Sequence, residues 1–132
     1  MATISNPKLA VQENLPGGKV KVDVTCTVTF TAFEKFTMDH GVKFSLACRL
    51  WGADAWPNPD DSLYTFPRKL FPDATPTLVE QVTFTATMSH SVLNEDDYIG
   101  NRTDEVYAGL TLTNLETNAQ VRKTTNQLSH NF

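Results

Sequence analysis

The chain has 132 residues, of which 40% are hydrophobic and 20% are charged, and it carries a formal net charge of −4 with a sequence pI near 5.2. This length suits one domain with a single core, and this composition argues against a largely disordered chain. Lysine and arginine form no run, so the broad basic surface used by nucleic-acid binders is missing, and no apolar stretch is long enough to span a bilayer.

The amino-terminal stretch MATISNPKLAVQ has neither a basic start nor a continuous apolar run. This pattern lacks a secretory signal and predicts synthesis in the cytoplasm. A subunit of a virion or of an injection apparatus, which leaves the cell by lysis, would begin in the same way, so the final location stays open. We treat residues 1–132 as a single domain.

Hydrophobic and polar residues alternate with a period of two along most of the chain. The apolar residues fall on even positions, as in Val20 to Phe30, where threonine fills most of the odd positions. This alternation is typical of a strand with one buried face and one wet face. The strand at 20–31 is followed by three more with the same phase, at 42–50, 82–88 and 106–112. Weaker segments at 4–11, 62–66 and 119–125 complete the predicted set of strands.

Seven short strands with proline and glycine between them predict an all-β fold, an antiparallel β-sandwich of about seven strands. An immunoglobulin-like sandwich is the favoured type, and a C2-like or jelly-roll sandwich is the alternative. No segment shows a sustained helical period, so no helix is expected. The Cys–Trp–Cys spacing of true immunoglobulin domains is absent, since the two cysteines lie only 22 positions apart.

Cys26 and Cys48 both fall on the buried phase. A hairpin of strands 20–32 and 42–50, in which opposed residue numbers sum to 74, would place the two cysteines opposite each other. Alternatively, the two strands lie in facing sheets and the cysteines approach across the core. We expect two reduced core thiols without a redox role, because no CxxC motif is present.

Acidic residues gather in three predicted loops. If successive strands alternate in direction, the loops at 12–19, 51–61 and 90–105 share one end of the sandwich. That end then holds nine acids against two bases. The opposite end is expected to be more basic, around Lys35, Arg68 and Lys69, which would make the molecule electrically polar along its long axis.

The stretch WGADAWPNPDD at 51–61 combines two tryptophans with aspartates. Trp51 falls on the odd phase, so its ring is expected either under a folded-back loop or on the outer face of its sheet. Capping of the core is one interpretation of Trp51 and Trp56, and an aromatic and acidic recognition surface is the other.

Threonines also share the outer faces of two strands. Thr25, Thr27, Thr29 and Thr31 lie on one strand, and Thr83, Thr85 and Thr87 lie on another. In an immunoglobulin-like topology these strands are neighbours, which predicts a flat threonine surface suited to a subunit contact.

Two functional hypotheses follow, and neither is an enzyme. The first is a non-catalytic interaction or structural subunit without a cofactor, which forms homo-oligomers or joins a virion, a pilus-like fibre or an injection apparatus. The second is a module that uses the loops at 51–61 and 90–105 to bind Ca²⁺, a glycan or a lipid headgroup. The candidate binding residues are Trp51, Trp56, Asp60, Asp61, Asp96, Asp97 and Asp104, and the calcium ligands of the second hypothesis are Asp60, Asp61, Asp96 and Asp97.

Overall fold

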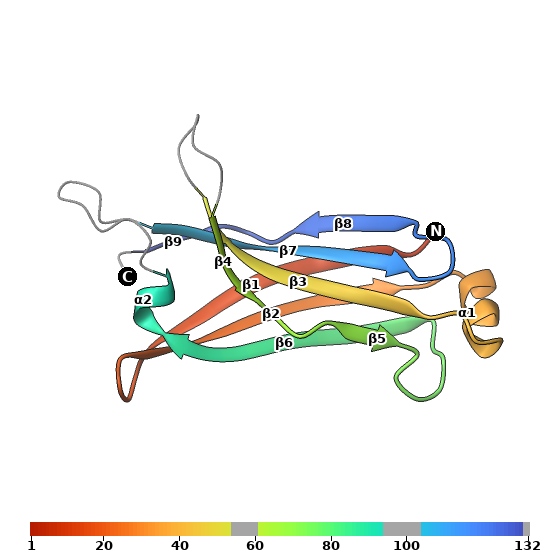
Figure 1. Cartoon of the computed structure of the whole chain (residues 1–132), viewed down its shortest axis with the longest axis horizontal. Coiled ribbons are helices and arrows are strands. Elements are labelled where there is room, and N and C mark those ends of the chain that lie inside the picture. The colour runs from red at the N-terminus through yellow and green to blue at the C-terminus, as the bar shows by residue number, and fades with distance from the viewer. Residues whose placement is uncertain (54–60, 94–103, 131–132) are drawn as a thin grey trace.

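The protein consists mainly of β-strands, which form two antiparallel sheets packed face to face (Figure 1). The structure, a computed structural model, describes residues 1–53, 61–93 and 104–130. Its elements, in chain order, are β1 (Thr3–Leu15), β2 (Lys19–Thr29), α1 (Ala32–Asp39), β3 (Phe44–Gly52), β4 (Asp61–Thr65), β5 (Lys69–Phe71), β6 (Val79–Ser89), α2 (His90–Leu93), β7 (Asp104–Asn114), β8 (Gln120–Thr124) and β9 (Leu128–His130). No helix among the described residues is long and apolar enough to cross a membrane.

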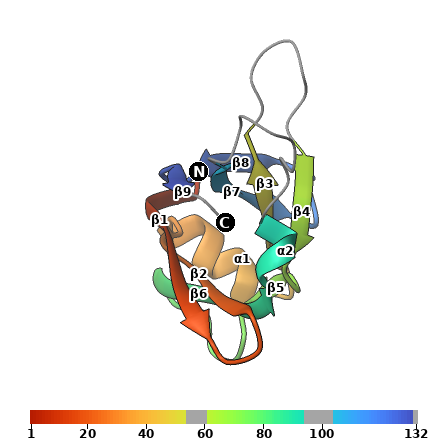
Figure 2. The ribbon, with the colours of Figure 1, turned by 90° about the vertical axis from the view of Figure 1, so that its left-hand side faces the viewer.

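The smaller sheet has the strand order β1-β2-β6, and the larger sheet has the order β4-β3-β7-β8 with β5 paired to β3 and β9 paired to β7. Figure 2 looks along the long axis and shows these two layers, with α2 toward the viewer and α1 behind. All seven predicted strands are present, so the predicted antiparallel two-layer β fold is confirmed. The structure adds the three-residue strands β5 and β9.

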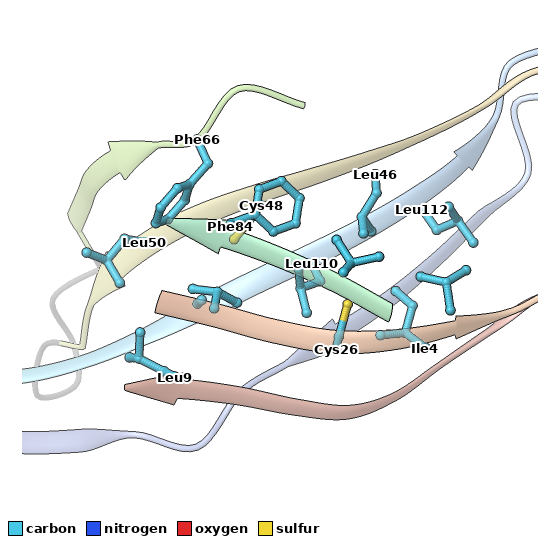
Figure 3. Close-up of a cluster of buried hydrophobic side chains, with 14 of the residues drawn as sticks. Ile4, Leu9, Cys26, Leu46, Cys48, Leu50, Phe66, Phe84, Leu110 and Leu112 are labelled. Atoms are coloured by element: carbon cyan, nitrogen blue, oxygen red, sulfur yellow. The ribbon is translucent and has the colours of Figure 1, made fainter. Parts of the chain in front are cut away.

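The core lies between the sheets and is built mainly from the even-numbered positions, as the alternation predicts. Val24 and Val28 of β2 and Leu46 and Leu50 of β3 are fully buried. Figure 3 shows such side chains meeting between the layers. Each aliphatic side chain buried in this way stabilises the fold by roughly 1.5–3 kcal/mol.

The predicted hairpin between strands 20–32 and 42–50 does not form. β2 pairs instead with β1 and β6, whereas β3 pairs with β4, β5 and β7. The two strands therefore lie in opposite sheets, which is the alternative arrangement considered for the cysteines. The segment between them contains α1, which carries the chain from one sheet to the other.

Two helices are present, contrary to the prediction that there would be none. Thr31, expected to continue the threonine face of the second strand, is instead the N-cap of α1. Its hydroxyl accepts a hydrogen bond from the Glu34 N–H at 3.1 Å, and the Glu34 carboxylate accepts one from the Thr31 N–H at 2.8 Å. This reciprocal capping box supplies partners for two N–H groups that the helix itself leaves unpaired.

We expect Thr31→Ala to lower the free energy of unfolding by about 1 kcal/mol, because the variant loses the side-chain half of the capping box. Chemical denaturation of the variant and the wild type measures the difference. Thr29→Ala serves as the control, because Thr29 is the last residue of β2 and lies outside the helix. An equal loss in both variants would contradict the role assigned to the cap.

Candidate functional site

The bases of the three predicted acidic loops meet at one end of the molecule, opposite α1 (Figure 1). The His90 N–H donates to the Gly18 carbonyl at 2.9 Å, which joins the β1–β2 turn to the start of α2. The Ala53 N–H donates to the Glu105 carbonyl at 2.8 Å, which joins the end of β3 to the start of β7. Within the described residues, the predicted convergence of these loops is confirmed.

Most of the predicted binding residues fall outside the part of the chain that the structure describes. These are Trp56, Asp60, Asp96 and Asp97. Asp61 and Asp104 are the first residues of β4 and β7, and their side chains are likewise not described. Over the ranges 1–53, 61–93 and 104–130, no group of three His, Cys, Asp or Glu side chains is arranged to hold a metal ion. The calcium hypothesis therefore stays a prediction.

The end that carries α1 is not the basic patch that the sequence suggested. Lys35 forms an ion pair with Asp39 at 3.6 Å on the same helix. The ammonium group of Lys69 lies 5.3 Å from the centroid of the Phe84 ring. Acidic residues of this end, such as Glu34 and Asp73, accompany the lysines, so positive and negative charges are mixed here.

Exposed apolar side chains distinguish this end from the rest of the described surface. The large hydrophobic residues that the structure leaves exposed are Met1, Phe33, Phe36, Leu70, Leu78, Val79 and Leu115. Phe33 and Phe36 project from α1 with exposed fractions of 72% and 56%, and their rings stack with centroids 6.4 Å apart. The Phe36 ring also lies 4.4 Å from that of His40.

Hydrogen bonds and strand pairing place four other members of this set at or next to residues of α1 or of the segments that flank it. Met1 precedes Ala2, whose N–H donates to the Glu34 carboxylate at 3.1 Å. The Leu115 N–H donates to the carbonyl of Lys43, just before β3, and the Leu78 carbonyl accepts from Phe30, just before the helix. Leu70 is paired with the second residue of β3. We call this set of seven exposed residues the α1 end.

Trp51 stands on the outer face of the larger sheet, half-buried, which is one of the two positions that its phase predicted. A Cβ atom placed on Gly109 of β7 would lie 3.3 Å from the indole Nε1 and 3.6 Å from Cδ1. The indole therefore leans across the neighbouring strand and rests over the glycine. The Arg49 guanidinium lies 5.5 Å from the centroid of the indole, and its Nε donates to the Thr65 hydroxyl at 3.2 Å.

The sequence interpretation missed several of these residues. Phe33 and Phe36 were assigned to no element, although the Thr31–Glu34 spacing of the capping box was available as a signal. Arg49 shares the odd phase of Trp51, which was a signal for their proximity. Gly109 gave none, because its position opposite the indole depends on the pairing of β3 with β7.

Cys26 and Cys48 are both free and buried, with exposed fractions of 4% and 1%. Figure 3 shows them projecting from facing strands into the same layer of the core. Burial raises the pKa of the Cys26 thiol to about 11. Burial, and to a smaller extent the neighbouring Cys26, raises the pKa of the Cys48 thiol to about 12. Thiols with such pKa values are protonated at neutral pH and are poor nucleophiles.

We expect these two thiols to make the fold less stable as the pH rises above about 9. An unfolded thiol loses its proton near pH 8.5, whereas the folded thiols keep theirs to about 11 and 12. The stability that the two protonated thiols contribute is therefore fully present below the pKa of the unfolded thiol. It is lost as the pH rises through the pKa values of the folded thiols. Denaturation at pH 7.5 and pH 10 should show a smaller fall in stability for Cys26→Ala/Cys48→Ala than for the wild type. Equal falls would contradict the assignment.

The threonines of β2 and β6 form the neighbouring surface that the sequence predicted. Thr25 lies directly opposite Thr83 in the pairing of the two strands. Polar neighbours interrupt the surface, since the Thr27 hydroxyl donates to Gln81 at 2.9 Å and Thr85 donates to the Asp23 carboxylate at 2.7 Å. The surface is therefore hydrogen-bonded within itself.

No protein-family model and no curated protein matches the sequence. Among solved structures, the structural genomics target SoR45 is similar with a TM-score of 0.39 and 9% identity over 97% of this chain and 84% of that one. The Bordetella pertussis protein designated ApaA has a TM-score of 0.35 and 10% identity over 98% and 91% of the two chains. β-Glucosidase 3B from Thermotoga neapolitana has a TM-score of 0.36 and 7% identity over 99% of this chain and 17% of its own.

Proposed function

We propose that this chain is a non-catalytic, immunoglobulin-like β-sandwich that serves as an interaction or structural subunit and associates with a second copy through the α1 end. Assemblies of the kind found in virions, pilus-like fibres or injection machines are the setting in which such a subunit would work. The single observation that carries the proposal is the gathering of the exposed large hydrophobic side chains of the described surface at one end.

The strand order supports an immunoglobulin-like type. In one sheet of that fold, the second strand pairs with the first and with the fifth. In the other sheet, the sixth strand pairs with the third and with the seventh. Here β1 pairs with β2, β2 with β6, β3 with β7, and β7 with β8, and β5 is an extra short strand in the chain order. β4 pairs with β3, at the edge of the larger sheet.

The α1 end has the composition of a contact surface. Isolated exposed apolar residues are ordinary, but a contiguous group rimmed by polar residues marks a site of association. Two of its members are phenylalanines on a short helix, and aromatic residues supply much of the binding free energy at interfaces. The rim consists of charged residues of both signs, among them Lys35, Asp39 and Lys43.

The distribution of charge favours contact between two α1 ends. The loops whose bases lie at the opposite end contain most of the acidic residues in the sequence, so two such ends would repel each other. The rim of the α1 end carries charges of both signs, so it offers the acidic loops of the opposite end little attraction. A pair of α1 ends buries apolar surface on both sides without that repulsion, and such a contact closes as a two-fold dimer.

Sedimentation velocity over a series of protein concentrations tests the proposal. The expected result is a monomer–dimer equilibrium that persists at high salt, because apolar contacts are not screened. The same series with calcium and with a chelator should give identical results. A monomer at every concentration would refute self-association. Growth beyond the dimer that high salt reverses would instead indicate a head-to-tail contact driven by charge.

A further inference from the structure

The outer face of the larger sheet holds a shallow depression around Trp51 that the proposed subunit contact does not use. Its volume is about 420 Å³, and it runs across β3 and β7. The residues that line it include Ser45, Arg49, Trp51, Arg68, Gly109 and Gln120. It lies on the side of the sheet away from the core, so filling it would not disturb the packing between the layers.

The floor of the depression carries a flat aromatic surface. Trp51 leans over Gly109, where any larger residue would push the ring away, since even a Cβ would lie 3.3 Å from Nε1. The indole N–H has no hydrogen-bond partner among the described residues. A half-buried indole with an available donor is suited to the apolar face of a sugar ring, which also presents hydroxyl acceptors at its edge.

Guanidinium groups surround this surface, and no acidic residue lines it. The Arg49 guanidinium lies over the indole ring and its Nε donates to Thr65, while Arg68 lines the same depression. Arg122 extends the cationic border, because it pairs with Thr111 across β7 and β8 and donates to the side-chain Oε1 of Gln120 at 2.8 Å. Three arginines without a lining carboxylate select for a ligand that carries negative charge.

Neutral polar groups complete the lining. Ser45 is only 6% exposed, and within the described part of the chain its hydroxyl has no hydrogen-bond partner. Buried hydroxyl groups normally have one, so a ligand group that reached Ser45 would satisfy it. Thr111, Thr113 and Gln120 add hydroxyl and amide groups along the same face.

We infer that this face binds an acidic oligosaccharide of the uronic-acid type. One ring stacks on Trp51, its carboxylate is held by Arg49 and Arg68, and its hydroxyls bond to the neutral side chains. An acidic peptide would satisfy the arginines but has no ring face to place against the indole. A nucleic acid is disfavoured because the whole chain carries a net charge of −4.

The test is a titration with a hexamer of galacturonic acid in a Trp56→Phe background, which leaves Trp51 as the only tryptophan. The expected result is a saturable change in the Trp51 fluorescence, confirmed by calorimetry. Arg49→Gln and, separately, Arg68→Gln should each weaken binding by about tenfold or more, because each removes a charged hydrogen bond. Gly109→Val should weaken it by displacing the indole, and should shift the emission even without sugar.

Lys21→Gln is the matched control, because it removes a cation from the outer face of the other sheet and should leave binding unchanged. Melting curves show which variants remain folded, and Arg68→Gln keeps the test decisive if the loss of the Thr65 contact unfolds Arg49→Gln. Equal binding of a neutral glucose hexamer, equal weakening by Lys21→Gln or no binding at all would overturn the inference. If polyglutamate bound more tightly than the galacturonic acid hexamer, the ligand would be an acidic peptide and the inference would be overturned.

Discussion

Replacing Phe44 by alanine is expected to lower the free energy of unfolding by about 3–5 kcal/mol. Phe44 is 2% exposed, and its ring centroid lies 5.0 Å from that of Phe30 in an edge-to-face arrangement. Phe30 lies 5.7 Å from Phe71 in turn, so the three rings join β3, β5 and the segment between β2 and α1. Removing the Phe44 ring opens a cavity that these separate elements cannot jointly close.

Urea denaturation of the Phe44→Ala variant measures this loss. Phe33→Ala is the matched control, because it removes the same side chain from a position that is 72% exposed. The control should change the free energy of unfolding by no more than about 0.5 kcal/mol. If both substitutions lower the free energy of unfolding equally, the ring of Phe44 is not buried in the core. The packing of the two sheets described for this end would then be incorrect.

Replacing Phe33 and Phe36 together by serine is expected to weaken self-association by about a hundredfold or more. Each ring is a large exposed aromatic group at the centre of the proposed contact, where truncation of a hot-spot residue costs about 2 kcal/mol or more. The fold should be unaffected, because neither ring packs in the core. Sedimentation velocity and a melting curve on the same sample report the two quantities separately.

The control for this variant is Thr83→Ala/Thr87→Ala on the threonine surface of the smaller sheet. That surface was the other subunit contact suggested by the sequence, and its substitution should leave the dimer unchanged. Loss of the dimer in the threonine variant, with the phenylalanine variant unaffected, would move the contact from the α1 end to the sheet face.

The strands could be predicted from the sequence, but their partners could not. Alternation assigns a face to each residue, and any antiparallel pairing whose residue numbers sum to an even value keeps the apolar residues together. The imagined hairpin of 20–32 with 42–50 uses a sum of 74 and satisfies this rule. The actual pairings of β2 with β6 and of β3 with β7 use 108 and 158, which satisfy it equally well.

The helix α1 was missed for a related reason. Thr31 continues the odd-numbered threonines of β2, so the period of two appears to run on where the strand has already ended at Thr29. The helix is only eight residues long and buries a single side chain, Met38, so it shows no regular apolar face. Its signal was the local spacing of Thr31 and Glu34, which a search for periodicity does not detect.

The candidate surfaces were predictable to different degrees. The outward position of Trp51 was one of the two that its phase allowed, and the convergence of the loop bases at one end followed from the alternating direction of successive strands. The α1 end did not, because its seven residues come from segments that are distant in the sequence and meet only through the turns between the sheets. Its apolar character replaces the basic patch that counting charges had suggested around Lys35 and Lys69.

Small-angle X-ray scattering of the concentrated protein tests the central claim most directly, because the α1 end lies at one extremity of an elongated molecule (Figure 1). Contact between two α1 ends predicts a dimer whose maximum dimension approaches twice that of the monomer. A dimer whose maximum dimension stays close to that of the monomer would mean that the copies pair side by side through a sheet face, and it would contradict the assignment of the contact to Phe33, Phe36 and their neighbours.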